Sequence, residues 1–134
     1  MILDKNSIEV IVKKLDEVIR DKDIVVLLQG DLASGKTTFV KEFVKYKGII
    51  DVVTSPTFSL QTLYSDFIYH YDIYNKTLEE FISLGLLEEF DKQGIHFVEW
   101  GDEKLKAILD QYGFEVVVLK IEKKDDKREY IIES

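Results

Sequence analysis

A glycine-rich turn between an apolar run and a helix-like stretch constrains this chain more than any other feature. Residues 30–37 read G-D-L-A-S-G-K-T, which fits the pattern G-x-x-x-x-G-K-[ST]. The preceding run, residues 24–28, is wholly apolar, as expected of a parallel strand buried on both faces. Residues 38–46 then carry apolar side chains at helical spacing. This order of strand, loop and helix predicts a binding site for a nucleoside triphosphate.

In such a loop, backbone N–H groups and the start of the helix face the anion. Lys36 is expected to reach the β- and γ-phosphates, and the Thr37 hydroxyl to bind Mg²⁺. The residues predicted to contact the nucleotide here are Asp31, Leu32, Ala33, Ser34, Gly35, Lys36, Thr37 and Thr38. The alternative is an ordinary strand–turn–helix whose glycines only shape the turn.

Length and composition favour a single ordered domain spanning residues 1–134, with 46% hydrophobic and 33% charged residues. No apolar run approaches the roughly 18 residues of a membrane span, and no signal-peptide pattern or cysteine occurs, so a cytoplasmic protein without membrane contact is expected. The net charge of −8 argues against tight direct binding of nucleic acid, because such binding depends on neutralising phosphates.

Hydrophobic periodicity predicts the remaining elements. Helices are expected over residues 8–19, 78–87 with a break at Gly85, and 102–109. Strands are expected over residues 52–53, 58–64, 67–71, 94–98, 114–121 and 129–133, with a turn at 123–127. Asn6 and Glu9 have the spacing of a helix cap and its reciprocal partner. The predicted fold is α/β: one P-loop NTPase domain, with a mixed central sheet flanked by helices.

Two acidic residues are candidates to complete the site. A phosphate loop needs an acid across from it to hold Mg²⁺, commonly where a strand ends at the carboxyl edge of the sheet. Glu99 follows the apolar strand 95–98 and is preferred as the magnesium-side acid; Asp72 follows the strand 67–71 and is assigned to the metal or the attacking water. The alternative for either is an exposed carboxylate at a strand end.

Other features of the sequence bear on the nucleotide. Thr57, in the segment S-P-T-F, stands where a switch loop would approach the γ-phosphate, although a simple proline turn explains it equally well. His70 and His96 lie inside apolar strands and are expected to be core histidines rather than ligands. ATP is favoured over GTP, because the segment 75–78 begins like the guanine motif N-K-x-D but lacks its aspartate.

Arginine is scarce, with only Arg20 and Arg128 in the chain. Kinases clamp the transferring phosphoryl group with arginines, and neither residue adjoins the phosphate loop in the sequence. Slow ATP hydrolysis by the chain alone is therefore expected. A small-molecule or nucleotide kinase of the P-loop class remains the alternative.

Five segments in this order resemble the TsaE (YjeE-like) family, small bacterial P-loop ATPases of tRNA threonylcarbamoyladenosine (t6A) biosynthesis. Residues 30–39 resemble its G-D-L-G-A-G-K-T-T-F, 55–58 its S-P-T-[FY], 70–74 its H-F-D-L-Y, 84–86 its L-G-[IL], and 99–100 its E-W. The sequence departs from this pattern at Ala33-Ser34, in place of Gly-Ala, at Asn75, in place of arginine, and at Gly101, in place of proline or alanine.

The resemblance implies a Mg²⁺-dependent ATPase that acts through a complex with TsaB and TsaD proteins. That complex modifies adenosine 37 of tRNAs reading codons that begin with A, so tRNA would be contacted only indirectly. The resemblance implies that Thr37 and Glu99 ligate Mg²⁺ and that Asp72 is needed for hydrolysis, with Lys36 counted among the catalytic residues. It further implies that Trp100 lies near the nucleotide. Asn6 and Arg128 are its candidates near adenine.

Overall fold

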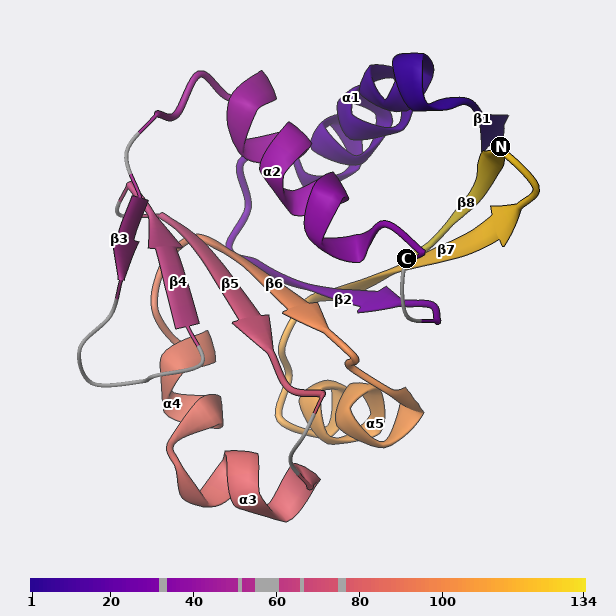
Figure 1. The fold of residues 1–134 in the computed structure, drawn as a ribbon. Coiled ribbons are helices and arrows are strands. Elements are labelled where there is room, and N and C mark those ends of the chain that lie inside the picture. The colour runs from indigo at the N-terminus through magenta and orange to yellow at the C-terminus, as the bar shows by residue number, and fades with distance from the viewer. Residues whose placement is uncertain (32–33, 51, 55–60, 66, 75–76) are drawn as a thin grey trace.

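A computed structural model describes residues 1–31, 34–50, 52–54, 61–65, 67–74 and 77–134 (Figure 1). A single eight-stranded sheet runs through these residues in the order β1-β8-β7-β2-β6-β5-β4-β3. Strand β2 is parallel to β6 and β7, and β5 is parallel to β6. The outer pairs are antiparallel, so the sheet is mixed, as the sequence predicts.

The strands are β1 (Ile2–Leu3), β2 (Ile24–Gln29), β3 (Val52–Thr54), β4 (Gln61–Tyr64), β5 (Ile68–Asp72), β6 (Ile95–Glu99), β7 (Val116–Lys124) and β8 (Lys127–Glu133). The helices are α1 (Ile8–Ile19), α2 (Lys36–Tyr46), α3 (Leu78–Ser83), α4 (Leu86–Phe90) and α5 (Glu103–Gln111), with a short 3₁₀ helix, η1 (Lys5–Ser7), before α1. The described part of the chain contains no helix long and apolar enough to cross a membrane.

Helices cover both faces of the sheet, which explains why its central strand is continuously apolar. Helices α1 and α2 lie on one face, and α3, α4 and α5 lie on the other (Figure 1). Alternate side chains of β2 enter two separate cores, with Val26 packing beneath α1 and α2 and Val25 on the opposite face. The parallel strands therefore deliver their carboxyl ends to one edge, where the phosphate loop follows β2.

Most predicted elements are confirmed within the described residues, although residues 58–60 of the predicted strand 58–64 lie outside them. The main differences are as follows. Strand β1 was not predicted, because two residues are too few to show a period; it pairs with β8 at the edge of the sheet. Strands β7 and β8 extend further into their connection, leaving only residues 125–126 between them. The Asn6–Glu9 cap is wrong: Asp4 caps the preceding 3₁₀ turn by accepting from the Asn6 N–H, and Ser7 takes the N-cap position of α1 without a side-chain bond.

Candidate nucleotide-binding site

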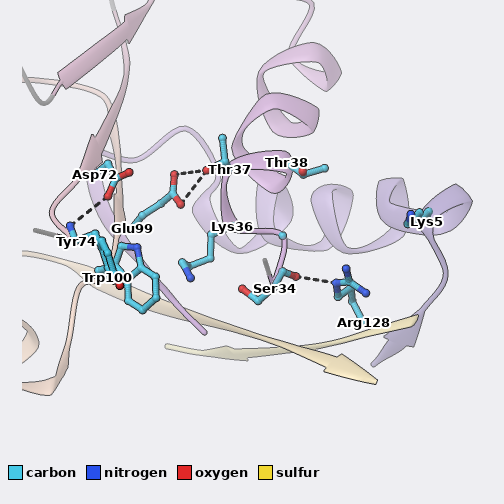
Figure 2. A pocket seen from close by; sticks show the side chains of 11 residues that line it. Lys5, Ser34, Lys36, Thr37, Thr38, Asp72, Tyr74, Glu99, Trp100 and Arg128 are labelled. Carbon is cyan, nitrogen blue, oxygen red and sulfur yellow. Dashed lines mark hydrogen bonds between the residues drawn. The ribbon is translucent and has the colours of Figure 1, made fainter. Parts of the chain in front are cut away.

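A cavity of about 440 Å³ opens at the carboxyl edge of the parallel strands (Figure 2). Its lining residues come from the phosphate loop and α2, the ends of β5 and β6, β8, and the turn before α1. They are Lys5, Ser34, Gly35, Lys36, Thr37, Thr38, Asp72, Tyr74, Glu99, Trp100 and Arg128. Residues as far apart in sequence as Lys5 and Arg128 thus line one space.

The glycines of the phosphate loop are required by its backbone. Gly30 has φ +151°, and a Cβ there would lie 2.2 Å from the carbonyl oxygen of Ile121. Gly35, at the N-cap of α2, has φ +109°. Between them the hydroxyl of Ser34 is buried without a hydrogen-bond partner among the described residues. Only glycine allows this tight path, which brings the start of α2 to the cavity.

Lys36 lies inside the loop. Its side chain is buried, and Nζ donates to the carbonyl oxygens of Gly30 at 2.6 Å and Asp31 at 2.9 Å. The same ammonium lies 3.7 Å from the ring centroid of Trp100, a cation–π distance. Burial lowers the pKa of Lys36, while the carboxylate of Glu99 opposes this shift. A positive charge is therefore held between the loop and the aromatic wall of the cavity.

Thr37 and Glu99 both line the cavity and point toward each other in direct contact, as Figure 2 shows. The Thr37 hydroxyl oxygen lies 2.9 and 2.7 Å from the two carboxylate oxygens of Glu99. His70 Nε2 lies 2.5 Å from the Oε2 oxygen of the same carboxylate. Burial would raise the pKa of Glu99, but the hydrogen bonds from His70 and Thr37 and the Lys36 charge bring it below its ordinary value. Glu99 is therefore an ionised carboxylate beside a hydroxyl group.

Asp72 stands directly opposite Glu99 in the register of β5 and β6. It is exposed, lines the cavity, and accepts the Tyr74 N–H at 3.2 Å. The Tyr74 ring packs on Trp100, with centroids 4.7 Å apart. Trp100 itself has φ +71°, so the chain turns sharply after Glu99 and brings the indole back to the cavity.

The donors present suit Mg²⁺ bound together with phosphates. No cluster of three or more metal-ligating histidine, cysteine, aspartate or glutamate residues exists within the described ranges. Mg²⁺ is commonly bound through one or two protein oxygens, with phosphate oxygens and water completing its octahedron. The Thr37 hydroxyl and the Glu99 carboxylate supply that number of oxygens.

Most of the predicted contact residues that the structure describes gather here, with two exceptions. Asn6 lines a neighbouring cavity of about 540 Å³, which shares Lys5 with the first. The backbone carbonyl of Asp31 holds Lys36, but Asp31 is not part of the cavity lining. The predicted contacts Leu32, Ala33 and Thr57 lie outside the described residues.

Arg128, a predicted contact near adenine, lies beside the phosphate loop in the fold. It is distant in sequence, yet its Nε donates to the Ser34 carbonyl oxygen at 2.9 Å (Figure 2). Pairing of β8 along β7 carries it there, a long-range placement that sequence spacing could not show. Two lining residues were missed. Tyr74 was signalled by its position two residues after Asp72, whereas nothing in the sequence marks Lys5.

Comparison with known proteins gives consistent matches along the chain. Residues 2–130 match the family model described as "Threonylcarbamoyl adenosine biosynthesis protein TsaE". The chain is 40% identical over 108 residues to "tRNA threonylcarbamoyladenosine biosynthesis protein TsaE" of Bacillus subtilis, covering 78% of this chain and 66% of the relative. It is 33% identical over 124 residues to the protein of that name from Haemophilus influenzae, covering 87% and 76%.

Another relative of the same name, from Rickettsia conorii, is 43% identical over 102 residues; the match covers 72% of this chain and 57% of the relative. Some curated relatives are thus matched over less than two thirds of their length. The crystal structure of YdiB from Bacillus subtilis superposes with a TM-score of 0.66 at 32% identity, covering 97% of this chain and 82% of that one. Because residues 2–130 of the 134 in this chain match the family model, this chain belongs to the TsaE family.

Proposed function

We propose that this chain is a Mg²⁺-dependent ATP-binding and ATP-hydrolysing subunit in the biosynthesis of threonylcarbamoyladenosine in tRNA. It acts through a complex with TsaB- and TsaD-type proteins, which modifies adenosine 37 of tRNAs reading codons that begin with A. Family membership supports the pathway, since the curated relatives are named for it. The net charge of −8 supports contact with tRNA through partners rather than directly.

One observation carries the ATPase part of the proposal. The Thr37 hydroxyl oxygen and the ionised carboxylate of Glu99 lie within 2.9 Å of each other, beside the buried ammonium of Lys36. A hydroxyl and an ammonium at the start of a helix after a glycine-rich turn, with a carboxylate at the end of strand β6, match the needs of a magnesium–triphosphate group.

Each residue has a distinct task in this proposal. The ammonium of Lys36 and the N–H groups at the start of α2 bind the phosphates and neutralise their charge. Thr37 and Glu99 hold Mg²⁺, which would stabilise negative charge on the β- and γ-phosphates. Asp72, exposed at the end of β5, orients the attacking water. Trp100 and Tyr74 form the aromatic wall that keeps the nucleotide in the cavity.

Hydrolysis by the isolated chain is expected to be slow. The guanidinium of Arg128 is engaged with the Ser34 and Lys127 carbonyl oxygens, and Arg20 caps the far end of α1. An arginine supplied to the γ-phosphate by a partner raises the rate of other P-loop enzymes by roughly 10³–10⁵. The kinase alternative gains no support, because no arginine-rich lid covers the cavity in the parts of the chain that the structure describes.

ATP binding and turnover test the site directly. Lys36→Ala should abolish measurable ATP binding in calorimetry, because it removes the only ammonium inside the loop. The matched control is Lys41→Ala, the same substitution at an exposed position of α2 outside the cavity. Equal ATP affinity in the two variants would contradict the proposal.

Reconstituted tRNA modification tests the pathway role. Multiple rounds of modification by a TsaB–TsaD pair should require this chain together with hydrolysable ATP. ATP hydrolysis should rise when the pair is added. A non-hydrolysable ATP analogue in place of ATP shows whether binding is sufficient. Modification at an unchanged rate without the chain would overturn the assignment.

A further inference from the structure

His70 contacts the lining residue Glu99 but does not itself line the cavity. Its Nε2 lies 2.5 Å from Oε2 of Glu99, and both side chains are buried, at 8% and 4% exposed. Because His70 is not part of the cavity lining, it reaches the nucleotide only through Glu99. Its role therefore depends on what it does to that carboxylate.

The sheet register explains the contact. In the parallel pair β5 and β6, His70 stands opposite Phe97, and Asp72 stands opposite Glu99. Side chains two residues apart on a strand share a face, so all four lie on the face covered by α2. Glu99 is thus bracketed between His70 on its own sheet and Thr37 on the helix above.

The direction of the hydrogen bond follows from the acceptor role of Glu99, whose carboxylate oxygens accept from the Thr37 hydroxyl. An ionised carboxylate only accepts, so the proton between the two groups belongs to Nε2 of His70. The imidazole also stacks at 6.5 Å between ring centroids on the buried Tyr64, which limits its rotation. The donor is therefore held in place by its own packing.

The two oxygens of Glu99 are consequently unequal. Oε2 is contacted by both His70 and Thr37, whereas Oε1 has only the Thr37 hydroxyl as partner within the described part of the chain. A hydrogen bond to one oxygen of a carboxylate fixes its rotation and leaves the other oxygen available to a cation.

We propose that His70 is a positioning residue: its Nε2–H fixes one oxygen of Glu99, so that the other faces a divalent cation beside Thr37. This inference rests on the proposed function, which makes Glu99 a metal-side acid. It adds a requirement that the function alone does not contain, namely a buried imidazole donor two residues before Asp72.

The experiment measures how Mg²⁺ changes ATP affinity. Calorimetry gives the affinity for ATP in EDTA and the Mg²⁺ concentration that produces half of the gain in affinity. His70→Leu removes the donor by introducing an apolar side chain of similar size, and it should raise that concentration by about 10-fold or more. Affinity in EDTA should stay within about twofold, because the phosphate loop is untouched.

Two polar variants, His70→Gln and His70→Asn, test the same role even if His70→Leu folds poorly. His70→Gln places an N–H near the position of Nε2 and should restore the response to Mg²⁺, whereas the shorter His70→Asn should not. His96→Leu is the matched control: it removes the other buried histidine, which lies on β6 and packs on the opposite face. It should leave the Mg²⁺ response unchanged even where it lowers the melting temperature.

The outcomes separate the inference from the proposed function. A wild-type Mg²⁺ response in His70→Leu, or equal responses in the Gln and Asn variants, would overturn the role of His70 alone. Loss of ATP affinity in EDTA that parallels a loss of stability would also overturn it, since that result indicates a purely structural histidine. A wild-type chain that binds ATP with no response to Mg²⁺ would overturn both.

Discussion

At the scale of single residues, the path of the phosphate loop requires glycine at position 30, because no side chain fits there. The Ile121 carbonyl oxygen on β7 would lie 2.2 Å from a Cβ at that position, so the strand and the loop touch through backbone atoms. That close approach fixes the carbonyl of Gly30, which in turn accepts from Lys36. The position of the ammonium is thus set by backbone packing beneath the loop.

Gly30→Ala is expected to destabilise the fold by about 2 kcal/mol or more, because neither the strand nor the loop can move away without strain. Chemical denaturation measures this loss. Gly48→Ala provides the matched control, since Gly48 also has a positive φ, +76°, but has nothing within 4 Å of the added Cβ. Equal losses in the two variants would show that backbone conformation dominates and that the contact with Ile121 contributes nothing.

At the scale of elements, three of the residues that line the cavity stand at the end of a helix or strand. Lys36 opens α2, Asp72 ends β5, and Glu99 ends β6. Helix α5 begins only four residues after Glu99, and the Asp102 carboxylate caps it by accepting the Leu105 N–H at 2.9 Å. The start of α5 therefore limits how far the turn at Trp100 can move.

Asp102→Ala should cost about 1 kcal/mol in the free energy of unfolding, because an N–H of the first turn loses its acceptor. Urea denaturation checks the value, and Asp126→Ala, in the exposed β7–β8 turn, is the control. Asp102→Asn should recover most of the loss, since asparagine caps helices as well as aspartate. If Asp102→Ala were as stable as Asp126→Ala, the cap at Asp102 would contribute nothing to stability.

Elements with a strong local period could be predicted from the sequence, and those defined by distant partners could not. The apolar run of β2 and the stripe of α1 reveal themselves because burial repeats along the chain. Strand β1 is a strand only because β8 pairs with it, and Asp4 caps a single 3₁₀ turn that is too short to show a helical period.

The same division holds within the candidate site. Glu99 was identified because a strand end is a local signal, whereas its contact with His70 depends on register between two strands. Arg128 reaches the phosphate loop through a hairpin whose pairing the sequence does not display. Sequence spacing therefore predicts the residues that carry the proposed chemistry, such as Glu99. It does not predict the long-range contacts that hold them in place, such as that of His70 with Glu99.

At the scale of the whole molecule, the two faces of the sheet use their buried histidines differently. His70 on β5 donates to an ionised carboxylate beneath α2. His96 on β6 packs on the other face: Nε2 contacts the Lys92 carbonyl oxygen at 2.8 Å, and Nδ1 contacts the Tyr71 hydroxyl at 2.7 Å. A carbonyl only accepts, so Nε2 carries the proton and Tyr71 donates to Nδ1 of a neutral ring.

This neutral histidine should make the fold acid-sensitive. Burial lowers the pKa of His96 to about 4, below its ordinary value of 6.5. Well above pH 6.5 the ring is neutral whether the chain is folded or not. As pH falls from 6.5 towards 4, only the unfolded chain gains the proton, so stability should decline by up to about 3 kcal/mol.

Urea denaturation at several pH values checks this decline. The variant His96→Leu should be less stable at pH 7 but should lose stability less steeply between pH 6.5 and 4, because it has no ring to protonate. Parallel slopes in the two proteins would mean that other groups cause the acid sensitivity.

The indole at the mouth of the cavity gives the protein an optical property of its own. The chain contains a single tryptophan, and that residue lies 3.7 Å from the Lys36 ammonium. A nucleotide that draws the ammonium towards its phosphates changes the electric field across the only indole in the molecule. Intrinsic emission should therefore shift on titration with ATP and stay constant in Lys36→Ala, so occupancy can be followed in unlabelled protein.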